Sequence, residues 1–194
     1  MALFAGTGVS KQSQDSKAAG KEAAQAALKD AGIEKADIAL VMGSSVFDQS
    51  QMLAGIAEVL GDSPVVGCTS AGAITGDGVQ EQAVTVLALK SDTAQFIPIK
   101  VTGIGKDMRA AGKKFGEAVK TGGGDSLKMA LMFSDALAGN GTDLVRGILE
   151  VLGSDFRLGG GAAADDLNFK KTYQYFGTEA MNDAVVGFAI AGDI

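Results

Sequence analysis

The chain has 194 residues, of which 46% are hydrophobic and 21% are charged, a balance typical of one compact globular domain. The net charge of −6 comes without a basic cluster, so nucleic acid is not an expected partner, because binding to phosphates needs clustered Lys and Arg. Histidine is absent and one cysteine is present, which removes the usual general base and excludes an internal disulfide.

Hydrophobic patterning predicts alternating strands and helices. In the first half we expect strands at 2–9, 38–42, 64–67 and 83–89, with helices at 16–31 and 49–60. In the second half we expect strands at 95–101, 129–133 and 184–190, with helices at 108–120 and 143–152. Residues 157–161 are expected to lead into a glycine-alanine loop. This order predicts an α/β fold of layered mixed sheets with helices packed on them. We expect mainly parallel pairing inside each half, with the last strand antiparallel.

The sequence repeats itself at an interval of 92 residues. Residues 4–72 align without gaps on residues 96–164, and Ala18-Ala19-Gly20-Lys21 falls on Ala110-Ala111-Gly112-Lys113. The last strand follows at an offset of 101, so the second half carries an insert before residue 184. We predict a single domain over 1–194, built from duplicated βαβαββ-like halves at 1–92 and 93–194. We expect a pseudo-two-fold axis between them, and a cleft at such an axis is a natural ligand site.

Two stretches of small residues follow predicted strands at corresponding positions of the repeat. Gly67–Gly72 and Gly159–Ala164 are expected to be loops, at the strand ends where α/β proteins bind ligands. Their small side chains let backbone N–H groups approach a ligand, although tight packing between the halves also explains the glycines. With nearby carboxylates that suit a ligand ammonium, the candidate ligand-binding residues are Cys68, Thr69, Ser70, Gly72, Asp135, Gly160, Gly161, Asp165 and Asp166.

Catalysis and metal binding have weaker support in the sequence. Cys68 is a potential nucleophile, but no histidine is available to activate it, and Ser70 lacks the first glycine of a Gly-x-Ser-x-Gly elbow. Asp77, Asp135, Asp165 and Asp166 do not follow a spaced cation-binding pattern. We therefore expect no catalytic residues, no metal and no cofactor.

Three segments resemble the FIST domain family. They are Pro64–Gly72, which contains Val-Val-Gly-Cys, Phe133–Asn140, and Leu158–Asp166 with the following Phe169–Tyr173. They occur in family order. The resemblance implies an intracellular sensory module for a small ligand, such as an amino acid. Ala73 stands where the family often has Glu, and Thr69-Ser70 reverses the family's Ser-Thr order.

The resemblance also implies partners. FIST proteins usually carry a C-terminal FIST region and a signalling output domain, and we expect such a region or a signalling protein to be supplied by another chain. Residues 23–33 and 37–41 are similar to the first half of thiolase-like ketoacyl synthases, duplicated α/β enzymes that need His. We expect a cytoplasmic, non-enzymatic sensory domain without a membrane segment. The alternatives are an enzyme that uses Cys68 covalently and a protein-interaction scaffold without a small ligand.

Overall fold

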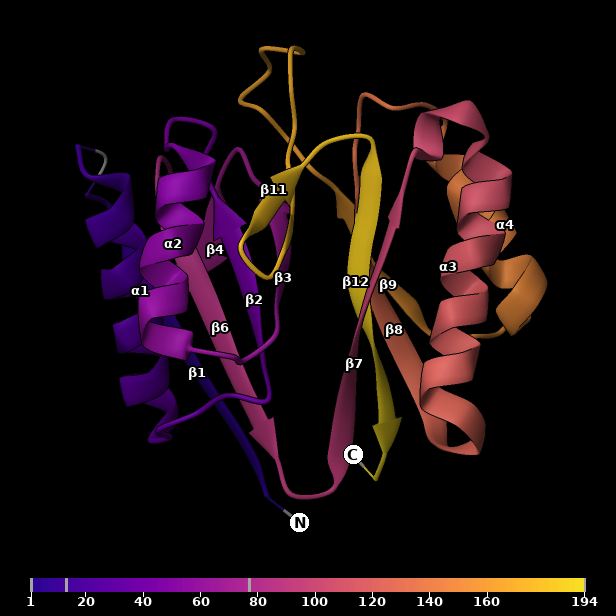
Figure 1. Ribbon diagram of the computed structural model, residues 1–194, viewed down its shortest axis with the longest axis horizontal. Coiled ribbons are helices and arrows are strands. Elements are labelled where there is room, and N and C mark those ends of the chain that lie inside the picture. The colour runs from indigo at the N-terminus through magenta and orange to yellow at the C-terminus, as the bar shows by residue number, and fades with distance from the viewer. Residues whose placement is uncertain (1, 13, 77, 194) are drawn as a thin grey trace.

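The computed structural model describes residues 2–12, 14–76 and 78–193. Figure 1 shows a pair of helices, two facing sheets and a second pair of helices. The helices are α1 (Ser16–Ala31), α2 (Gln49–Leu60), α3 (Met108–Gly123) and α4 (Gly141–Leu152), with 3-10 turns η1 (Ile104–Lys106) and η2 (Gly124–Ser126). The strands are β1 (Leu3–Ser10), β2 (Ile38–Gly43), β3 (Val65–Thr69), β4 (Ala73–Thr75), β5 (Gly78–Gln80), β6 (Val84–Ser91), β7 (Ala94–Thr102), β8 (Leu127–Ser134), β9 (Leu158–Ala162), β10 (Gln174–Phe176), β11 (Glu179–Met181) and β12 (Ala184–Gly192).

The predicted layered α/β class is confirmed, and the strand pairing corrects one expectation. The six-stranded sheet has the order β1-β6-β2-β3-β10-β11, the four-stranded sheet has the order β7-β12-β8-β9, and β4 and β5 form a separate hairpin. Among the described strands, only β2–β3 and β8–β9 pair in parallel. In each half the last strand lies between the first two and pairs with both antiparallel. The expected mainly parallel pairing is therefore wrong, because that strand separates two that run in the same direction.

Helix boundaries follow from capping residues. Each of the four helices begins after an N-cap residue whose side chain accepts a hydrogen bond from a backbone N–H group of the first turn. The N-cap residues are Asp15, Asp48, Asp107 and Asn140. Each ends at a glycine, which is Gly32, Gly61, Gly124 or Gly153. Such caps satisfy backbone groups that lack partners inside the helix. The predicted bounds of α1 and α2 are confirmed.

Each helix pair crosses at a close contact that only glycine permits. A Cβ atom on Gly20 would lie 2.1 Å from the Met52 carbonyl oxygen, and one on Gly112 would lie 2.1 Å from the Leu144 oxygen. Both the glycines and the oxygens that they approach stand 92 residues apart. The halves therefore share their element order, sheet order and helix crossing. Their descent from one duplicated unit and the pseudo-two-fold axis stay predictions.

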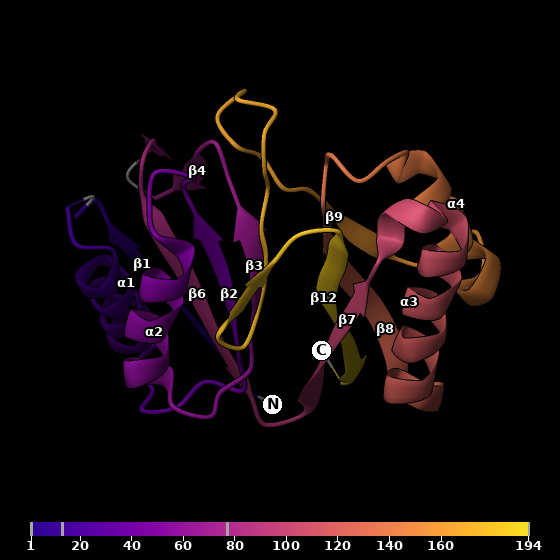
Figure 2. The same ribbon diagram turned by 45° about the horizontal axis from the view of Figure 1, so that its top comes forward.

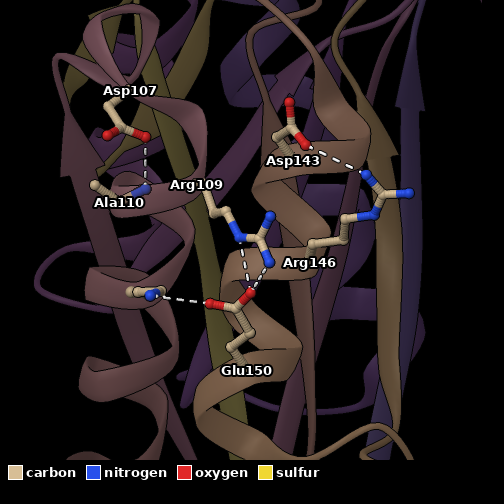
Figure 3. Close-up of polar contacts among 7 residues, drawn as sticks. Asp107, Arg109, Ala110, Asp143, Arg146 and Glu150 are labelled. Atoms are coloured by element: carbon tan, nitrogen blue, oxygen red, sulfur yellow. Dashed lines mark hydrogen bonds and ion pairs between the residues drawn. The ribbon is translucent and has the colours of Figure 1, made fainter.

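The same interval recurs in the ion pairs that join the helices. Lys17 and Lys21 on α1 meet Glu58 on α2. At the corresponding positions Arg109 and Lys113 on α3 meet Glu150 on α4, and Figure 3 shows Arg109 reaching across to Glu150. These side chains are largely exposed, so each pair is worth little on its own. The interhelical ion pairs thus occupy corresponding positions in the two halves.

The insert in the second half joins the sheet of the first half. Its strands β10 and β11 form a hairpin, and β10 pairs antiparallel with β3. Tyr175 on β10 is fully buried in the core beneath α1 and α2, and its hydroxyl donates a hydrogen bond to Gln49 on α2. The sequence did not predict these strands. Their pairing ties the chain's last quarter to its first half.

The two sheets pack face to face through an apolar layer that is separate from the cores beneath α1 and α2 and beneath α3 and α4. Ile38, Val66 and Phe188 form its buried centre, and Phe96 packs edge-to-face on Phe188 with ring centroids 6.1 Å apart. The ribbons meet near the turn between β6 and β7 and spread apart toward the other end of the sheets (Figure 1 and Figure 2). The carboxyl ends of β3 and β9 lie toward that open end, with the segment 163–173 beside them.

Candidate functional site

The carboxyl ends of β3 and β9 come together where the sheets separate. The Ala164 N–H donates a hydrogen bond to the Thr69 carbonyl at 3.0 Å. The Thr69 N–H donates to the Tyr173 carbonyl at 2.9 Å, and the Thr69 hydroxyl accepts from the Tyr173 N–H at 3.0 Å. Thr69 is 1% exposed. One buried threonine thus connects the six-stranded sheet to the chain that leaves the four-stranded sheet.

The glycines at these strand ends have different roles. The expectation that Gly67–Gly72 and Gly159–Ala164 are loops is wrong in part, because β3 extends through Thr69 and β9 through Ala162. A Cβ atom on Gly67 would lie 1.8 Å from the Val41 oxygen, and one on Gly160 would lie 1.9 Å from the Met132 oxygen. Sheet packing therefore demands these two glycines. A Cβ atom on Gly161 would have no neighbour within 4 Å, so that glycine leaves open space.

A cavity of about 300 Å³ lies at this meeting point, and we call it the junction cavity. It is lined by Met42, Cys68, Thr69, Ser70, Phe133, Gly160, Gly161, Ala162 and Ala164. The predicted residues from both strand ends, Cys68 to Ser70 with Gly160 and Gly161, are thus brought together. Phe133 and the two alanines belong to the segments that resemble the FIST family, whereas Met42 was not among the predicted residues. No signal in the sequence indicated Met42, because it reads as an ordinary strand residue.

The backbone of β9 adds hydrogen-bonding capacity to the cavity. Among the described strands, this one lies at the edge of its sheet and pairs with β8 alone. The Ala163 N–H points to that neighbour and donates to the Ser134 carbonyl at 2.8 Å, whereas the Ala164 N–H points the other way, to Thr69. Because backbone groups alternate along a strand, those of Gly160 and Ala162 face away from β8. A ligand in the junction cavity can therefore bond to main-chain N–H and C=O groups.

Cys68 lies in an apolar environment. The residue is 4% exposed, and its Sγ atom lies 3.7 Å from the Met42 Sδ atom. Burial raises the pKa of the Cys68 thiol to about 12. The thiolate is the reactive form of cysteine, and a reactive cysteine normally has a lowered pKa. The surroundings of Cys68 are those of a structural thiol.

Asp135 lies outside the junction cavity. Its Oδ1 atom accepts hydrogen bonds from the Thr172 hydroxyl at 2.7 Å and the Leu137 N–H at 2.9 Å. Its Oδ2 atom accepts from the Asp183 N–H at 2.8 Å. The side chain is buried and lines a different cavity. Its carboxylate connects three segments of the chain, so it is already satisfied by protein donors.

Asp165 and Asp166 also lie outside the junction cavity. Asp165 is buried and accepts hydrogen bonds from the N–H groups of Lys170, Lys171 and Phe169 at 2.7, 3.0 and 3.0 Å. These bonds, led by that of Lys170, lower the pKa of the Asp165 carboxyl. Asp166 is exposed and accepts a hydrogen bond from Ser45. Both aspartates thus shape the segment 165–171.

The remaining predictions concern Gly72 and a metal. Gly72 lines an apolar cavity beside β1, β2 and β6, which Ser70 and Met42 also reach. Within residues 2–12, 14–76 and 78–193, no group of three or more acidic, Cys or His side chains is arranged to hold a metal ion. Asp77, a candidate cation ligand, lies outside the described residues. Among the described helices, none is both long and apolar enough to cross a bilayer.

Comparison with known proteins identifies the family. A search of curated proteins gives no match. The crystal structure of cyanuric acid hydrolase from A. caulinodans is similar in fold, with a TM-score of 0.52 and 10% sequence identity over the whole of this chain and 72% of that chain. At that identity the likeness shows the fold alone. The family model of the FIST N domain matches residues 37–194, and the chain therefore belongs to the FIST N domain family of small-ligand sensory domains.

Proposed function

We propose that this FIST N domain is a non-enzymatic, cytoplasmic sensory domain that binds a small polar ligand in the junction cavity. The observation that carries the proposal is the meeting of two strand ends, one from each sheet, around one cavity. The Ala164–Thr69 hydrogen bond holds these ends together. A ligand seated there contacts both sheets at once.

The lining of the cavity suits a small polar molecule such as an amino acid. Its volume of about 300 Å³ is at the lower end of the range for small-molecule sites. Phe133 and Met42 supply apolar walls, while Ser70 and the outward backbone groups of β9 supply donors and acceptors. An ammonium group would be met by backbone carbonyls, because the carboxylates of Asp135 and Asp165 are bound to protein donors.

The same contacts support a sensory role over a catalytic one. The Cys68 thiol, the nucleophile of the alternative function, has its pKa raised by burial to about 12. A ligand that contacts both sheets would favour one relative position of the two sheets where they spread apart. A signalling protein or a C-terminal FIST region on another chain can bind selectively to that conformation. Such a partner is part of the proposal.

Gly161→Leu is the variant that tests the proposal. A side chain at Gly161 meets no atom within 4 Å of its Cβ, so the variant is expected to fold while filling part of the cavity. Gly141→Leu is the matched control, since a Cβ atom at Gly141, in the first turn of α4, is also free of neighbours. Thermal unfolding against amino acids and small metabolites should show a ligand that shifts the midpoint of the wild type and the control only. Equal shifts in all three proteins would refute the site.

A further inference from the structure

A second cavity, of about 380 Å³, lies apart from the junction cavity. It forms where the connection between β7 and α3 meets the loop between β8 and α4, the segment 170–172 and the turn between β11 and β12. We call it the lysine cavity. It is lined by Gly105, Lys106, Asp135, Leu137, Ala138, Lys170, Lys171, Thr172, Asn182 and Asp183. It shares no lining residue with the junction cavity.

The floor of the lysine cavity is a fixed hydrogen-bond network around Asp183. This residue has a left-handed backbone, with a φ of 51°, which Asp tolerates better than most residues. Its carbonyl accepts from the N–H groups of Gly103 and Ile104 at 2.7 and 3.3 Å, and its Oδ1 atom accepts from the Gly105 N–H at 2.7 Å. Its own N–H donates to Asp135. The turn that forms the floor is therefore held from several sides before any ligand arrives.

The acidic groups of the cavity are engaged with the protein. Both oxygens of Asp135 accept hydrogen bonds, from Thr172, Leu137 and Asp183, and Oδ1 of Asp183 binds Gly105. A carboxylate that already accepts such bonds gains less from a ligand cation. Three of the four carboxylate oxygens are thus occupied by protein donors, which leaves less capacity for a ligand cation.

The basic groups of the cavity have no such partners. Lys106, Lys170 and Lys171 line it, and none of them forms an ion pair within the described residues, whereas Lys17, Lys21, Lys35, Lys100 and Lys113 do. The Lys171 ammonium lies 4.6 Å from the centroid of the Tyr173 ring. Lys106 and Lys170 come from distant parts of the sequence. The lining of this cavity thus carries three lysines against two aspartates, Asp135 and Asp183, in a chain whose net charge is −6.

We propose that the lysine cavity binds a small dianion, a molecule with a phosphate group or with two carboxylates. Lys106 and Lys170 bind the anion by charge-assisted hydrogen bonds, and the Asn182 side chain offers a neutral donor. Lys171, held over Tyr173, adds positive potential. This site goes beyond the proposed function, because it is a separate cavity and takes a different class of ligand.

The experiment is an NMR titration of the ¹⁵N-labelled chain with sodium phosphate and, separately, sodium succinate. Sodium chloride at matched ionic strength is the reference. Saturable shifts are expected at the amides of Gly103–Lys106 and Asn182–Asp183, on the cavity floor. Lys106→Gln/Lys170→Gln should weaken the affinity about tenfold or more, as expected when charged hydrogen-bond partners are lost. Lys114→Gln/Lys128→Gln, an equal charge change on exposed lysines outside the cavity, should leave the affinity unchanged.

The titrations with phosphate and succinate distinguish the two kinds of dianion. Saturation by phosphate alone assigns a phosphate-bearing ligand, saturation by succinate alone assigns a dicarboxylate, and saturation by both supports the dianion class. No saturable shift with either anion overturns the proposal, as does equal weakening in the two double variants. Gly161→Leu should bind these anions like the wild type. A negative result for anion binding in the lysine cavity therefore does not bear on ligand binding in the junction cavity, and a negative result for the junction cavity does not bear on the lysine cavity.

Discussion

The Ala164 N–H donates a hydrogen bond to the Thr69 carbonyl at 3.0 Å, and this contact joins the ends of two strands that belong to different sheets. The Thr69 hydroxyl completes the connection by accepting from the Tyr173 N–H at 3.0 Å. Because the junction cavity lies beside this contact, Thr69 both lines the cavity and holds its two walls together.

Replacing Thr69 by valine should destabilise the protein by about 1–2 kcal/mol, because the part-buried Tyr173 N–H loses its acceptor. Valine has nearly the same shape as threonine, so the change in the free energy of unfolding measures the contribution of the hydroxyl group. Thr69→Ser keeps the hydroxyl and is the control, with an expected cost of about 1 kcal/mol for the lost methyl group. Urea unfolding of the three proteins measures the difference. A Thr69→Val variant as stable as the wild type would show that the hydroxyl bond contributes nothing.

Gly20→Ala should destabilise the α1–α2 pair, and Gly112→Ala should destabilise the α3–α4 pair. The two variants should lose a similar free energy of unfolding. Each added Cβ atom would lie 2.1 Å from a carbonyl oxygen of the facing helix, so the helices must move apart at a cost of about 1–3 kcal/mol. Gly141→Ala, where a Cβ atom meets nothing within 4 Å, should be neutral or stabilising by up to about 1 kcal/mol. Thermal unfolding tests this. Unchanged stability in Gly20→Ala or Gly112→Ala would contradict the described helix crossing.

Much of this fold could be predicted from the sequence, because the signals are local. Apolar periodicity and the glycines that end the helices place α1 and α2, and the interval of 92 residues relates Gly20 to Gly112. The position of β6 between β1 and β2 could not be predicted, since nothing local in a strand records its neighbour. The pairing of β10 with β3 is likewise a contact between distant segments.

The candidate site was predictable only in part for a related reason. Cys68 to Ser70 and Gly160 to Gly161 follow strands, and strand ends gather at one edge of a sheet. The positions of Asp135 and Asp165 depend on which backbone N–H groups they accept from. Sequence spacing does not reveal such partners.

Acid should weaken the contact between α3 and α4 through Glu150. Hydrogen bonds from Arg109 and then Lys113 lower the pKa of Glu150 from 4.5 to about 2. A lowered pKa gives stability that is present above pH 4.5 and lost as the pH falls toward 2. Glu150→Gln should show a smaller loss of stability over this range than the wild type. Glu117→Gln, on the exposed side of α3, is the control and should follow the wild type. Parallel curves for wild type and Glu150→Gln would refute the effect.

Asp165→Asn should loosen the segment 165–171. The neutral amide has one oxygen for three backbone donors, so the N–H groups of Phe169, Lys170 and Lys171 should exchange with solvent faster. The lowered pKa of Asp165 means that the wild type should lose this protection as the pH falls below 3.8, the carboxyl's ordinary value. Asp166→Asn is the control, because Asp166 is exposed. Hydrogen exchange at the three amides decides the matter, and unchanged protection in Asp165→Asn would contradict the described bonding.

Cys68 should react slowly with thiol reagents in the native protein. Burial and a thiol pKa of about 12 leave almost no thiolate at pH 8. The rate of alkylation should rise by orders of magnitude in denaturant, where the thiol is exposed. Fast native labelling would instead favour the covalent enzyme alternative.

The most direct test of the proposed function is thermal unfolding of the wild type and Gly161→Leu with a panel of amino acids and small metabolites. A ligand at 100 times its dissociation constant should raise the wild-type midpoint by about 5–10 °C. One chemical class should produce this shift in the wild type and in Gly141→Leu, and Gly161→Leu should show none. A shift of the same size in Gly161→Leu would contradict ligand binding in the junction cavity.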